Sequence, residues 1–136
     1  MPSIEEVRWI DLASVNDERG ILSSIESSID IPFEIKRIFY MHHIVSDRGG
    51  HAHLDTDQVI IAISGGFQIE LYDGTEKVSF TMDNPIKGLF VPRMIFIQLF
   101  DFSKDAVCLV LASTHYDIKK SLRNIEAYNE AINENL

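Results

Sequence analysis

Cysteine is scarce in this 136-residue chain and long apolar runs are missing, and each absence excludes a class of protein. Cys108 is the only cysteine, so no internal disulfide can form, and its apolar setting in "AVCLVLA" indicates a buried side chain rather than a nucleophile. No hydrophobic run approaches the roughly 20 residues that a membrane-spanning helix needs. The first residues, "MPSIEEVRWIDL", lack the basic and apolar regions of a secretory signal. We therefore expect a cytoplasmic protein with no membrane partner.

Basic residues are also few, with 12 Lys and Arg against 21 Asp and Glu and a net charge of −9. Such an acidic surface repels nucleic-acid backbones, and no basic stripe offsets it, so nucleic acid is not an expected partner. An anionic small molecule can still bind where a few arginines converge. The arginines near any candidate site therefore matter.

No repeat, low-complexity segment or linker divides the chain, which predicts a single domain. Most of it forms short strand-like runs between turn residues, the pattern of an antiparallel β-sandwich or small barrel. The expected strands cover residues 34–43, 58–64, 67–72, 77–82, 88–92, 95–100 and 106–112. Glycine-bearing turns at 64–66 ("SGG") and 73–74 ("DG") predict hairpins.

The last twenty residues change to helical spacing. Asp117 is a candidate N-cap. The apolar residues that recur with this spacing are Ile118, Leu122, Ile125, Tyr128 and Ile132. The sequence thus predicts an all-β barrel over about residues 1–115, with an amphipathic helix over about 117–133 packed outside it.

The motif "RGGHAHLDTDQ" (48–58) is the strongest candidate for a functional site. On a strand, His51 and His53 point to the same face and Ala52 points the opposite way. Gly49 and Gly50 let the backbone turn sharply just before the pair. The alternative is two surface or hydrogen-bonded core histidines, but co-facing polar groups after Arg-Gly-Gly favour a binding pocket.

"GHAH" followed by "ISGG" resembles the first motif of the cupins, small antiparallel β-barrels. Metal-binding cupins supply two His and a Glu there and another His in a second motif. In this chain the Glu position holds Gln58, and the second-motif segment 88–100 has no histidine. Two ligands are too few for a typical catalytic metal site, and a rescue by His42 or His43 lacks support from spacing. We expect no metal.

Without a metal, two co-facing imidazoles are suited to general acid–base chemistry, since an unperturbed pKa near 6.5 lets histidine take and return a proton at neutral pH. A nearby arginine can neutralise a phosphate or a developing enolate oxygen. Proton abstraction beside a carbonyl and return to the neighbouring carbon is an isomerisation. It requires no redox cofactor, so we expect no cofactor.

A narrower resemblance covers nearly the whole chain. "DERGIL", "IPFEIKRIFYM", "RGGHAH", "ISGGFQIELYDG", "FDFS" and "LAS..YD" occur in the order seen in the sugar 3,4-ketoisomerases. These cupins convert dTDP-4-keto-6-deoxyglucose to a 3-keto sugar, which is then aminated to a 3-amino-3,6-dideoxyhexose for surface glycans. The resemblance implies this activity, a dTDP-linked ketosugar substrate and a homodimer, with "VRWIDL" as a possible exchanged strand.

The resemblance also implies roles for individual residues. His51 and His53 match the pair that moves the proton between C3 and C4 through an enediol. Tyr40 matches a tyrosine-bearing strand and is expected as a hydrogen-bond donor to the sugar. A barrel-filling aromatic is the alternative, and strand alternation allows only one of Phe39 and Tyr40 to enter the barrel.

Four further positions are expected to bind substrate. Arg48 matches the arginine of the histidine motif, and Gln58 is a polar pocket residue. Arg19 fits the family pattern at "DERG", although a structural turn arginine is an equal alternative. Arg37 is a weaker candidate. Arg93 is a weaker candidate too, because a charged residue beside a strand end is usually just solvated. Tyr116 matches a family position and is read as structural.

The chain departs from the family pattern in two places. Leu54 replaces the usual Lys after "HAH", and "IFIQL" lacks the usual substrate-contacting His or Arg near residue 97. This leaves the product configuration at C4 open. The alternatives are a non-catalytic cupin that binds a sugar nucleotide, a 3,5-epimerase and a metal-dependent oxygenase.

Overall fold

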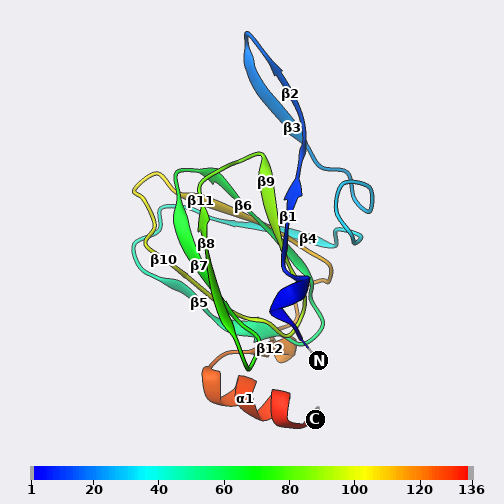
Figure 1. Cartoon of the computed structure of the whole chain (residues 1–136), viewed down its shortest axis with the longest axis vertical. Coiled ribbons are helices and arrows are strands. Elements are labelled where there is room, and N and C mark those ends of the chain that lie inside the picture. The colour runs from blue at the N-terminus through cyan, green and yellow to red at the C-terminus, as the bar shows by residue number, and fades with distance from the viewer. Residues whose placement is uncertain (1, 135–136) are drawn as a thin grey trace.

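Two five-stranded antiparallel sheets face each other in the computed structural model, which describes residues 2–134 (Figure 1). The first sheet has the order β1-β9-β6-β11-β4, with bounds Arg8–Asp11, Lys87–Val91, Gln58–Ser64, Val107–Ala112 and Arg37–Met41. The second has the order β12-β5-β10-β7-β8, with bounds Ser121–Leu122, Arg48–His53, Phe96–Phe100, Phe67–Tyr72 and Lys77–Met82. A short 3-10 helix, η1 (Ile4–Glu6), precedes β1. The predicted all-β antiparallel fold is confirmed.

Burial along the strands explains why these segments form sheets. In β7 every second residue is buried, namely Phe67, Ile69 and Leu71, which is the pattern of a strand with one face on the core. Strand β6 is buried on both faces from Gln58 to Ala62 because an apolar cluster covers each face. Ile60 packs into the core between the sheets, whereas Ile61 packs into a second apolar cluster that includes Leu12.

The two glycine turns behave differently. Asp73 and Gly74 connect β7 to β8, which pair antiparallel, so the predicted "DG" hairpin is confirmed. The "SGG" hairpin prediction is wrong, because β6 pairs with β9 and β11 while β7 belongs to the other sheet. Gly65 lies tightly against the 103–105 loop, where a Cβ would collide with the Ser103 hydroxyl. This turn therefore carries the chain from one sheet to the other.

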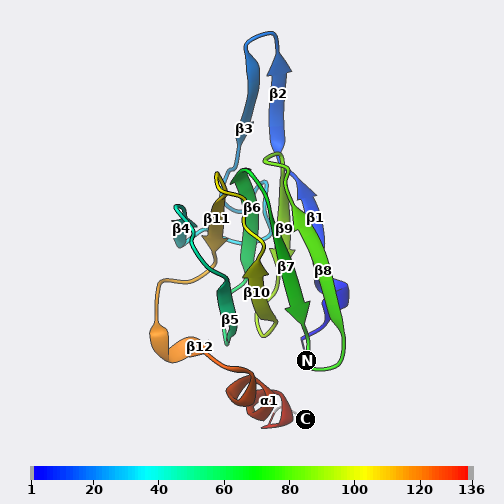
Figure 2. The same cartoon turned by 90° about the vertical axis from the view of Figure 1, so that its left-hand side faces the viewer.

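A two-stranded arm, β2 (Ala13–Asp17) and β3 (Gly20–Ser24), projects from the barrel (Figures 1 and 2). The sequence reading did not predict it as strands. All ten of its strand residues are exposed. "VRWIDL" is not part of the arm: its β1 segment pairs with β9 of the same chain.

The C-terminal helix is shorter than predicted. Asp117 caps the 3-10 helix η2 (Ile118–Lys120), and β12 then pairs with β5. Helix α1 (Ile125–Glu134) begins only after Asn124, whose side-chain oxygen accepts a hydrogen bond from the Ala127 amide at 2.8 Å. The helix packs outside the barrel as expected, with Tyr128 and Ile132 buried. Within the part of the chain that the structure describes, no helix is long and apolar enough to cross a membrane.

Candidate active site

A glycine bulge at the start of β5 sets the direction of the two histidines. Gly49 pairs with Gln98 of β10, and His51 pairs with Ile97, so Gly50 has no partner opposite. The φ angles are +92° at Gly49 and +74° at Gly50, a region that side-chain-bearing residues rarely adopt. A Cβ at Gly49 would also lie 2.7 Å from the Ile97 carbonyl oxygen. The double glycine therefore lets β5 bend closely past β10 just before the histidines.

His51 and His53 line the same cavity, which confirms the predicted common facing. Their ring centroids are 5.1 Å apart and their planes are nearly perpendicular, at 78°. The cavity has a volume of about 370 Å³ and opens to solvent. Its lining residues are Arg37, Phe39, His51, His53, Tyr116, Ser121 and Arg123. Ala52 points the other way and is fully buried under α1.

Helix α1 supports the histidine strand from outside the barrel. Tyr128 is fully buried, and its hydroxyl donates a hydrogen bond to the Met94 carbonyl at 2.7 Å. The Met94 amide in turn donates to the carbonyl of His53 at 2.8 Å. Ala52 lies in the same apolar cluster as Tyr128 and Met94. A backbone hydrogen bond at His53 and the apolar packing of Ala52 therefore both hold the histidine strand in place.

The surroundings of both imidazoles lower their pKa and so favour the neutral form. Burial is the largest cause that lowers the pKa of His53, to about 4, and the charges of His51 and Arg37 act in the same direction. Burial also lowers the pKa of His51 below 6.5, aided by the charge of Arg123 and opposed by a hydrogen bond to backbone. A neutral imidazole has a free ring nitrogen that can accept a proton. The pair therefore has the protonation state that a base requires.

Ser121 fixes the ring of His53 and was not among the predicted site residues. Its hydroxyl oxygen lies 3.3 Å from Nδ1 of His53. The other ring nitrogen, Nε2, is buried and has no hydrogen-bond partner among residues 2–134. Since His53 lines the cavity, Nε2 is the nitrogen left for a ligand. Ser121 lies directly opposite His53 in the β12–β5 pairing, so this contact depends on β12.

Arg37 and Arg123 bring two positive charges to the cavity. The Arg37 guanidinium lies between two aromatic rings, 5.0 Å from the Phe39 centroid and 5.2 Å from that of Tyr116. Its Nε atom is buried without a hydrogen-bond partner in the described chain. Arg37 was predicted as a weaker candidate, and Tyr116 as structural. Arg123 was not singled out, because it lies in a segment read only as a surface helix.

A second, smaller cavity of about 120 Å³ lies deeper in the barrel. His51 and Phe39 line both cavities. Two predicted substrate-binding residues, Arg48 and Gln58, line the deeper one, and Gln58 is 4% exposed. The remaining lining residues are Met41, Gly49, Ile60, Ile97, Leu99 and Val110. Arg48, which is exposed, and the buried Gln58 therefore both lie at a cavity next to His51, and their roles in substrate binding stay a prediction.

Tyr40 does not share the cavity with the histidines, so the structure contradicts its expected place. Arg37, Phe39 and Met41 point inward from β4, and alternation turns Tyr40 outward, where it is 62% exposed. Its ring lies beside that of His42 at 5.5 Å between centroids. Phe39 is the aromatic residue that enters the barrel.

Arg19 also lies away from the cavity of its own chain. It sits at the tip of the β2–β3 arm, where its guanidinium pairs with Asp17 at 2.7 Å and remains 85% exposed. Figures 1 and 2 show that the arm extends away from the end of the barrel that carries α1. Arg19 therefore does not line the cavity of its own chain, and its expected role in substrate binding stays a prediction.

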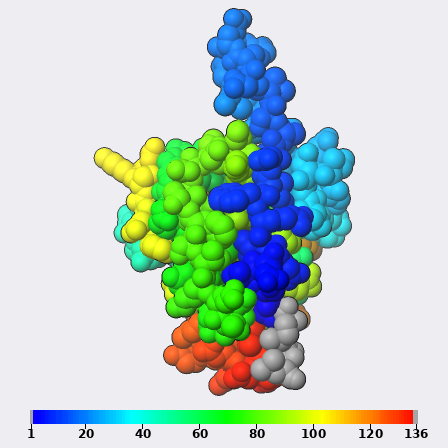
Figure 3. All heavy atoms as spheres, viewed as in Figure 1, coloured from blue at the N-terminus to red at the C-terminus, as the bar shows by residue number. Residues whose placement is uncertain are grey.

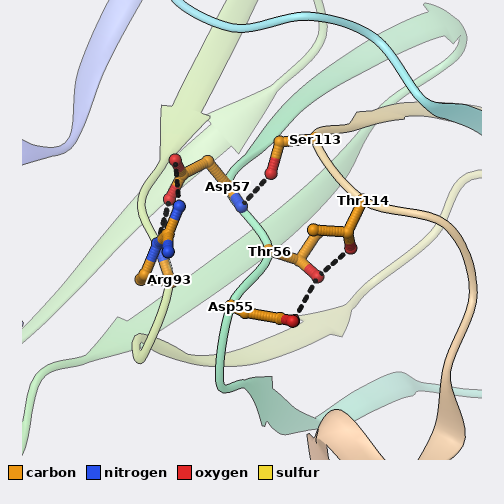
Figure 4. Close-up of polar contacts among 6 residues, drawn as sticks. All are labelled: Asp55, Thr56, Asp57, Arg93, Ser113 and Thr114. Carbon is orange, nitrogen blue, oxygen red and sulfur yellow. Dashed lines mark hydrogen bonds and ion pairs between the residues drawn. The ribbon is translucent and has the colours of Figure 1, made fainter.

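Arg93 joins two loops through the Asp57 carboxylate, as Figure 4 shows. Its side chain and amide donate hydrogen bonds to the Asp57 carboxylate, with the ion pair at 3.2 Å. The Asp57 amide donates to the Ser113 hydroxyl at 2.8 Å, and Thr56 and Thr114 share a hydrogen bond at 2.6 Å. These contacts join the β5–β6 loop to the β9–β10 turn and to the end of β11. Arg93, a weaker candidate in the sequence, does not line the cavity of the histidines and pairs with Asp57 instead.

No further metal-ligating side chains accompany the two histidines within residues 2–134. Among residues 2–134, no group of three or more His, Cys, Asp or Glu side chains could hold a metal ion. His42 and His43 form a separate exposed pair, with their Nδ1 atoms 2.7 Å apart, and neither lines the cavity. Cys108 is fully buried and its burial raises the thiol pKa to about 12, in keeping with a packing role.

Comparison with known proteins identifies the family. Residues 5–133 match the family model described as "FdtA: WxcM-like, C-terminal". A curated relative, the TDP-4-oxo-6-deoxy-alpha-D-glucose-3,4-oxoisomerase of Aneurinibacillus thermoaerophilus, is 35% identical over 93% of each chain.

Solved structures agree with this assignment. QdtA, a sugar 3,4-ketoisomerase from Thermoanaerobacterium thermosaccharolyticum in complex with TDP, has a TM-score of 0.93 and 32% identity, covering 98% of this chain and 99% of that one. A histidine-to-asparagine variant of the same enzyme, in complex with TDP-4-keto-6-deoxyglucose, has a TM-score of 0.92 and 32% identity over 97% of each chain. The chain belongs to the FdtA family and is an isomerase of the sugar 3,4-ketoisomerase type.

Proposed function

We propose that the protein converts TDP-4-keto-6-deoxyglucose to a TDP-3-keto-6-deoxyhexose, and that His51 and His53 move the proton without a metal. The product would then be aminated to a 3-amino-3,6-dideoxy sugar for a surface glycan. The observation that carries the proposal is the pair of neutral, co-facing imidazoles at one cavity, in a chain whose relatives act on this substrate or bind it. We also propose that the protein acts in the cytoplasm.

The chemistry needs one proton moved between adjacent carbons. One imidazole removes the C3 hydrogen as a proton, the C–H electron pair forms the C3=C4 double bond, and the C4 oxygen gains a proton, which gives an enediol. The enediol then takes a proton at C4 and loses the proton of its C3 oxygen, which leaves the carbonyl at C3. Atoms and electrons balance, so the step needs no redox partner. Two bases about 5 Å apart suit adjacent carbons.

The donor set supports a reaction that does not rely on a metal. The cavity offers two imidazoles, and the nearby Gln58 supplies a neutral amide, a weak ligand for transition metals. Arg37 and Arg48 line the two cavities, where a guanidinium can stabilise negative charge on a sugar oxygen.

Incubation with TDP-4-keto-6-deoxyglucose tests the activity, with the product identified by NMR. We expect a 3-keto sugar, and the same spectrum will assign the C4 configuration. Binding of the ketosugar with no conversion would contradict the proposal in favour of a non-catalytic binding protein. Inversion at C3 or C5 with the carbonyl still at C4 would contradict it in favour of an epimerase.

The proposal includes a homodimer joined through the β2–β3 arm. Val15 and Leu22 are cross-strand partners, and Ile21 lies on the other face, yet all three are more than half exposed. Figure 3 shows the arm standing clear of the barrel. An apolar two-stranded ribbon is unstable alone in water, since it buries little surface. In the homodimer expected from the sequence, a second copy of the chain covers the exposed apolar side chains of the arm.

A further inference from the structure

We propose that the smaller cavity receives the C6 methyl group of the sugar and makes the site selective for 6-deoxy sugars over sugars that carry a hydroxyl at C6. This inference rests on the proposed ketosugar substrate, and it gives a role to a space that the proton transfer alone does not require. The smaller cavity has a volume of about 120 Å³ and adjoins the larger one, since His51 and Phe39 line both.

The wall of the smaller cavity is mainly hydrocarbon. Its apolar side chains come from β4, β6, β10 and β11, and they belong to the core between the two sheets or pack against it. Those that belong to the core are at most 5% exposed, namely Ile60, Ile97, Leu99 and Val110. A hydroxyl placed against such a wall loses its hydrogen bonds to water, whereas a methyl group has none to lose.

The size of the cavity limits what it can take. Pockets that hold a whole small ligand have volumes of roughly 300–1,000 Å³. The larger cavity, at about 370 Å³, falls within this range, but the smaller one, at about 120 Å³, does not. A methyl group needs little more room than a water molecule, whose share of liquid volume is about 30 Å³. The smaller cavity therefore fits one or two substituents of a sugar rather than its ring.

The connectivity of the sugar brings C6 to this cavity. In the proposed reaction the C3–C4 edge of the ring lies at the histidines. C1, which carries the bulky nucleotide, is across the ring from C4 and points toward the larger cavity, which opens to solvent. C6 is attached to C5, beside C4, so it lies two bonds from a reacting carbon and within reach of the space next to His51. The C2 hydroxyl lies on the other side of the same edge, and the apolar wall favours the methyl group over it.

The polar residues of the smaller cavity allow a competing arrangement. Gln58 is 4% exposed and Arg48 is exposed, and both line this cavity. Their hydrogen bonds suit the C4 oxygen, which is carried by the carbon next to C5. If a hydroxyl at C6 took these hydrogen bonds instead, a 6-hydroxy sugar would bind as tightly as a 6-deoxy sugar. The two arrangements therefore predict different affinities.

Binding of TDP-6-deoxyglucose and of TDP-glucose, measured by calorimetry, tests the methyl subsite apart from catalysis. The two compounds differ only by the oxygen at C6, and neither has a ketone at C4. We expect the wild type to bind TDP-6-deoxyglucose about ten- to a hundredfold more tightly, the discrimination that an apolar pocket achieves against an added hydroxyl. Equal affinities, or tighter binding of TDP-glucose, would overturn the proposal.

A matched pair of valine variants locates the selectivity. Val110→Thr puts a hydroxyl at the smaller cavity with almost no change of size, so we expect the ratio of the two affinities to fall several-fold toward one. Val59→Thr is the control, since Val59 is equally buried in the same sheet but belongs to the other apolar cluster and lines neither cavity. An unchanged ratio in Val110→Thr, or an equal fall in Val59→Thr, would overturn the placement. The wild-type comparison needs no variant and decides the proposal even where a buried threonine destabilises the barrel.

Turnover of TDP-4-keto-6-deoxyglucose by the same wild-type sample separates this proposal from the proposed function. Preferential binding of TDP-6-deoxyglucose without turnover of the ketosugar would support the methyl subsite while it contradicts the isomerase activity. Turnover with equal affinity for the two TDP-sugars would support the activity and overturn the subsite. Failure to bind either TDP-sugar or to convert the ketosugar would contradict both.

Discussion

Each of the two histidines is controlled by different neighbours, although they lie one residue apart. His53 is held by Ser121 at Nδ1 and has an unpartnered Nε2, and its pKa falls to about 4. His51 lies at the boundary of the inner and outer cavities and keeps a hydrogen bond to backbone. Unequal surroundings suit a shuttle in which one group takes a proton from one carbon and another serves the neighbouring carbon.

The titration of His53 tests the electrostatic part of this picture. Burial lowers its pKa most, and the positive charge of Arg37 lowers it further. Arg37→Gln removes that charge, so we expect the pKa of His53 to rise from about 4 toward 6.5. Histidine ring signals followed by NMR from pH 3.5 to 8 measure it. An unchanged or lower pKa in the variant would contradict the assigned coupling, and Arg8→Gln should give the wild-type curve.

Ser121 is expected to position His53 rather than to contact the reacting atoms. Ser121→Ala removes the hydrogen bond to Nδ1, and we expect kcat to fall by roughly three- to tenfold, the worth of a single hydrogen bond, with little change in KM. Ser121→Thr keeps the hydroxyl and should restore most of the rate. Steady-state kinetics on all three proteins decide the matter. A loss in Ser121→Thr as large as in Ser121→Ala would contradict the role of the hydroxyl.

At the scale of secondary structure, the bulge between β5 and β10 determines where the site forms. Gly49 contacts the Ile97 carbonyl so closely that no side chain fits, whereas a Cβ at Gly50 would meet nothing within 4 Å. The two glycines therefore form a matched pair, since both have a positive φ but only one is crowded.

We expect Gly49→Ala to be the more damaging change. Gly50→Ala adds only backbone strain of about 1 kcal/mol, whereas Gly49→Ala adds a backbone clash and should cost about 2–3 kcal/mol or more. Unfolding in guanidinium chloride gives both free energies. Equal losses for the two variants would mean that the close approach to Ile97 is not what requires glycine.

The sequence predicted strands and helices well where no long-range pairing competed with the local pattern. The runs at 58–64, 67–72 and 77–82 coincide with β6, β7 and β8, because turn residues bound each apolar or alternating run. The helix start was misplaced because Leu122 continues the helical spacing, yet pairing with β5 holds it in a strand. Arg123 escaped notice for the same reason, since a contact between β12 and β5 joins residues about 70 positions apart.

The histidine pair could be predicted because residue type and strand alternation alone are enough to place the two rings on one face. His51 and His53 share a cavity as expected, and Arg48 and Gln58 line a second cavity that His51 also lines. Tyr40 was misplaced because the sequence cannot show which face of β4 turns inward. Arg37, Phe39 and Met41 take that face, and Tyr40 is left on the outer surface.

At the scale of the whole molecule, the exposed apolar side chains of the arm contrast with the acidic composition of the chain. Acidic residues outnumber basic ones across the chain, but the arm exposes Val15, Ile21 and Leu22. The arm extends away from the end of the barrel that carries α1 (Figures 1 and 2). An apolar arm in a charged protein is expected to be covered by another surface.

Sedimentation or light scattering tests the proposed dimer. We expect wild-type protein to have twice the mass of one chain, and Leu22→Asp to shift it toward the monomer, because a carboxylate would be buried in the contact. Val45→Asp is the control: Val45 is 96% exposed in a loop away from the arm and should leave the mass unchanged. A wild-type monomer at micromolar concentration would contradict the dimer.

The most direct test of the central claim is turnover of TDP-4-keto-6-deoxyglucose in deuterated water by wild-type protein and by His51→Asn and His53→Asn. We predict deuterium at C4 of the 3-keto product wherever the abstracted proton exchanges with solvent, and a fall in kcat of at least about a hundredfold in each variant, the usual contribution of acid–base catalysis. His42→Asn and His43→Asn, in the exposed pair outside the cavity, should keep the wild-type rate. Full activity in both His51→Asn and His53→Asn would contradict the account.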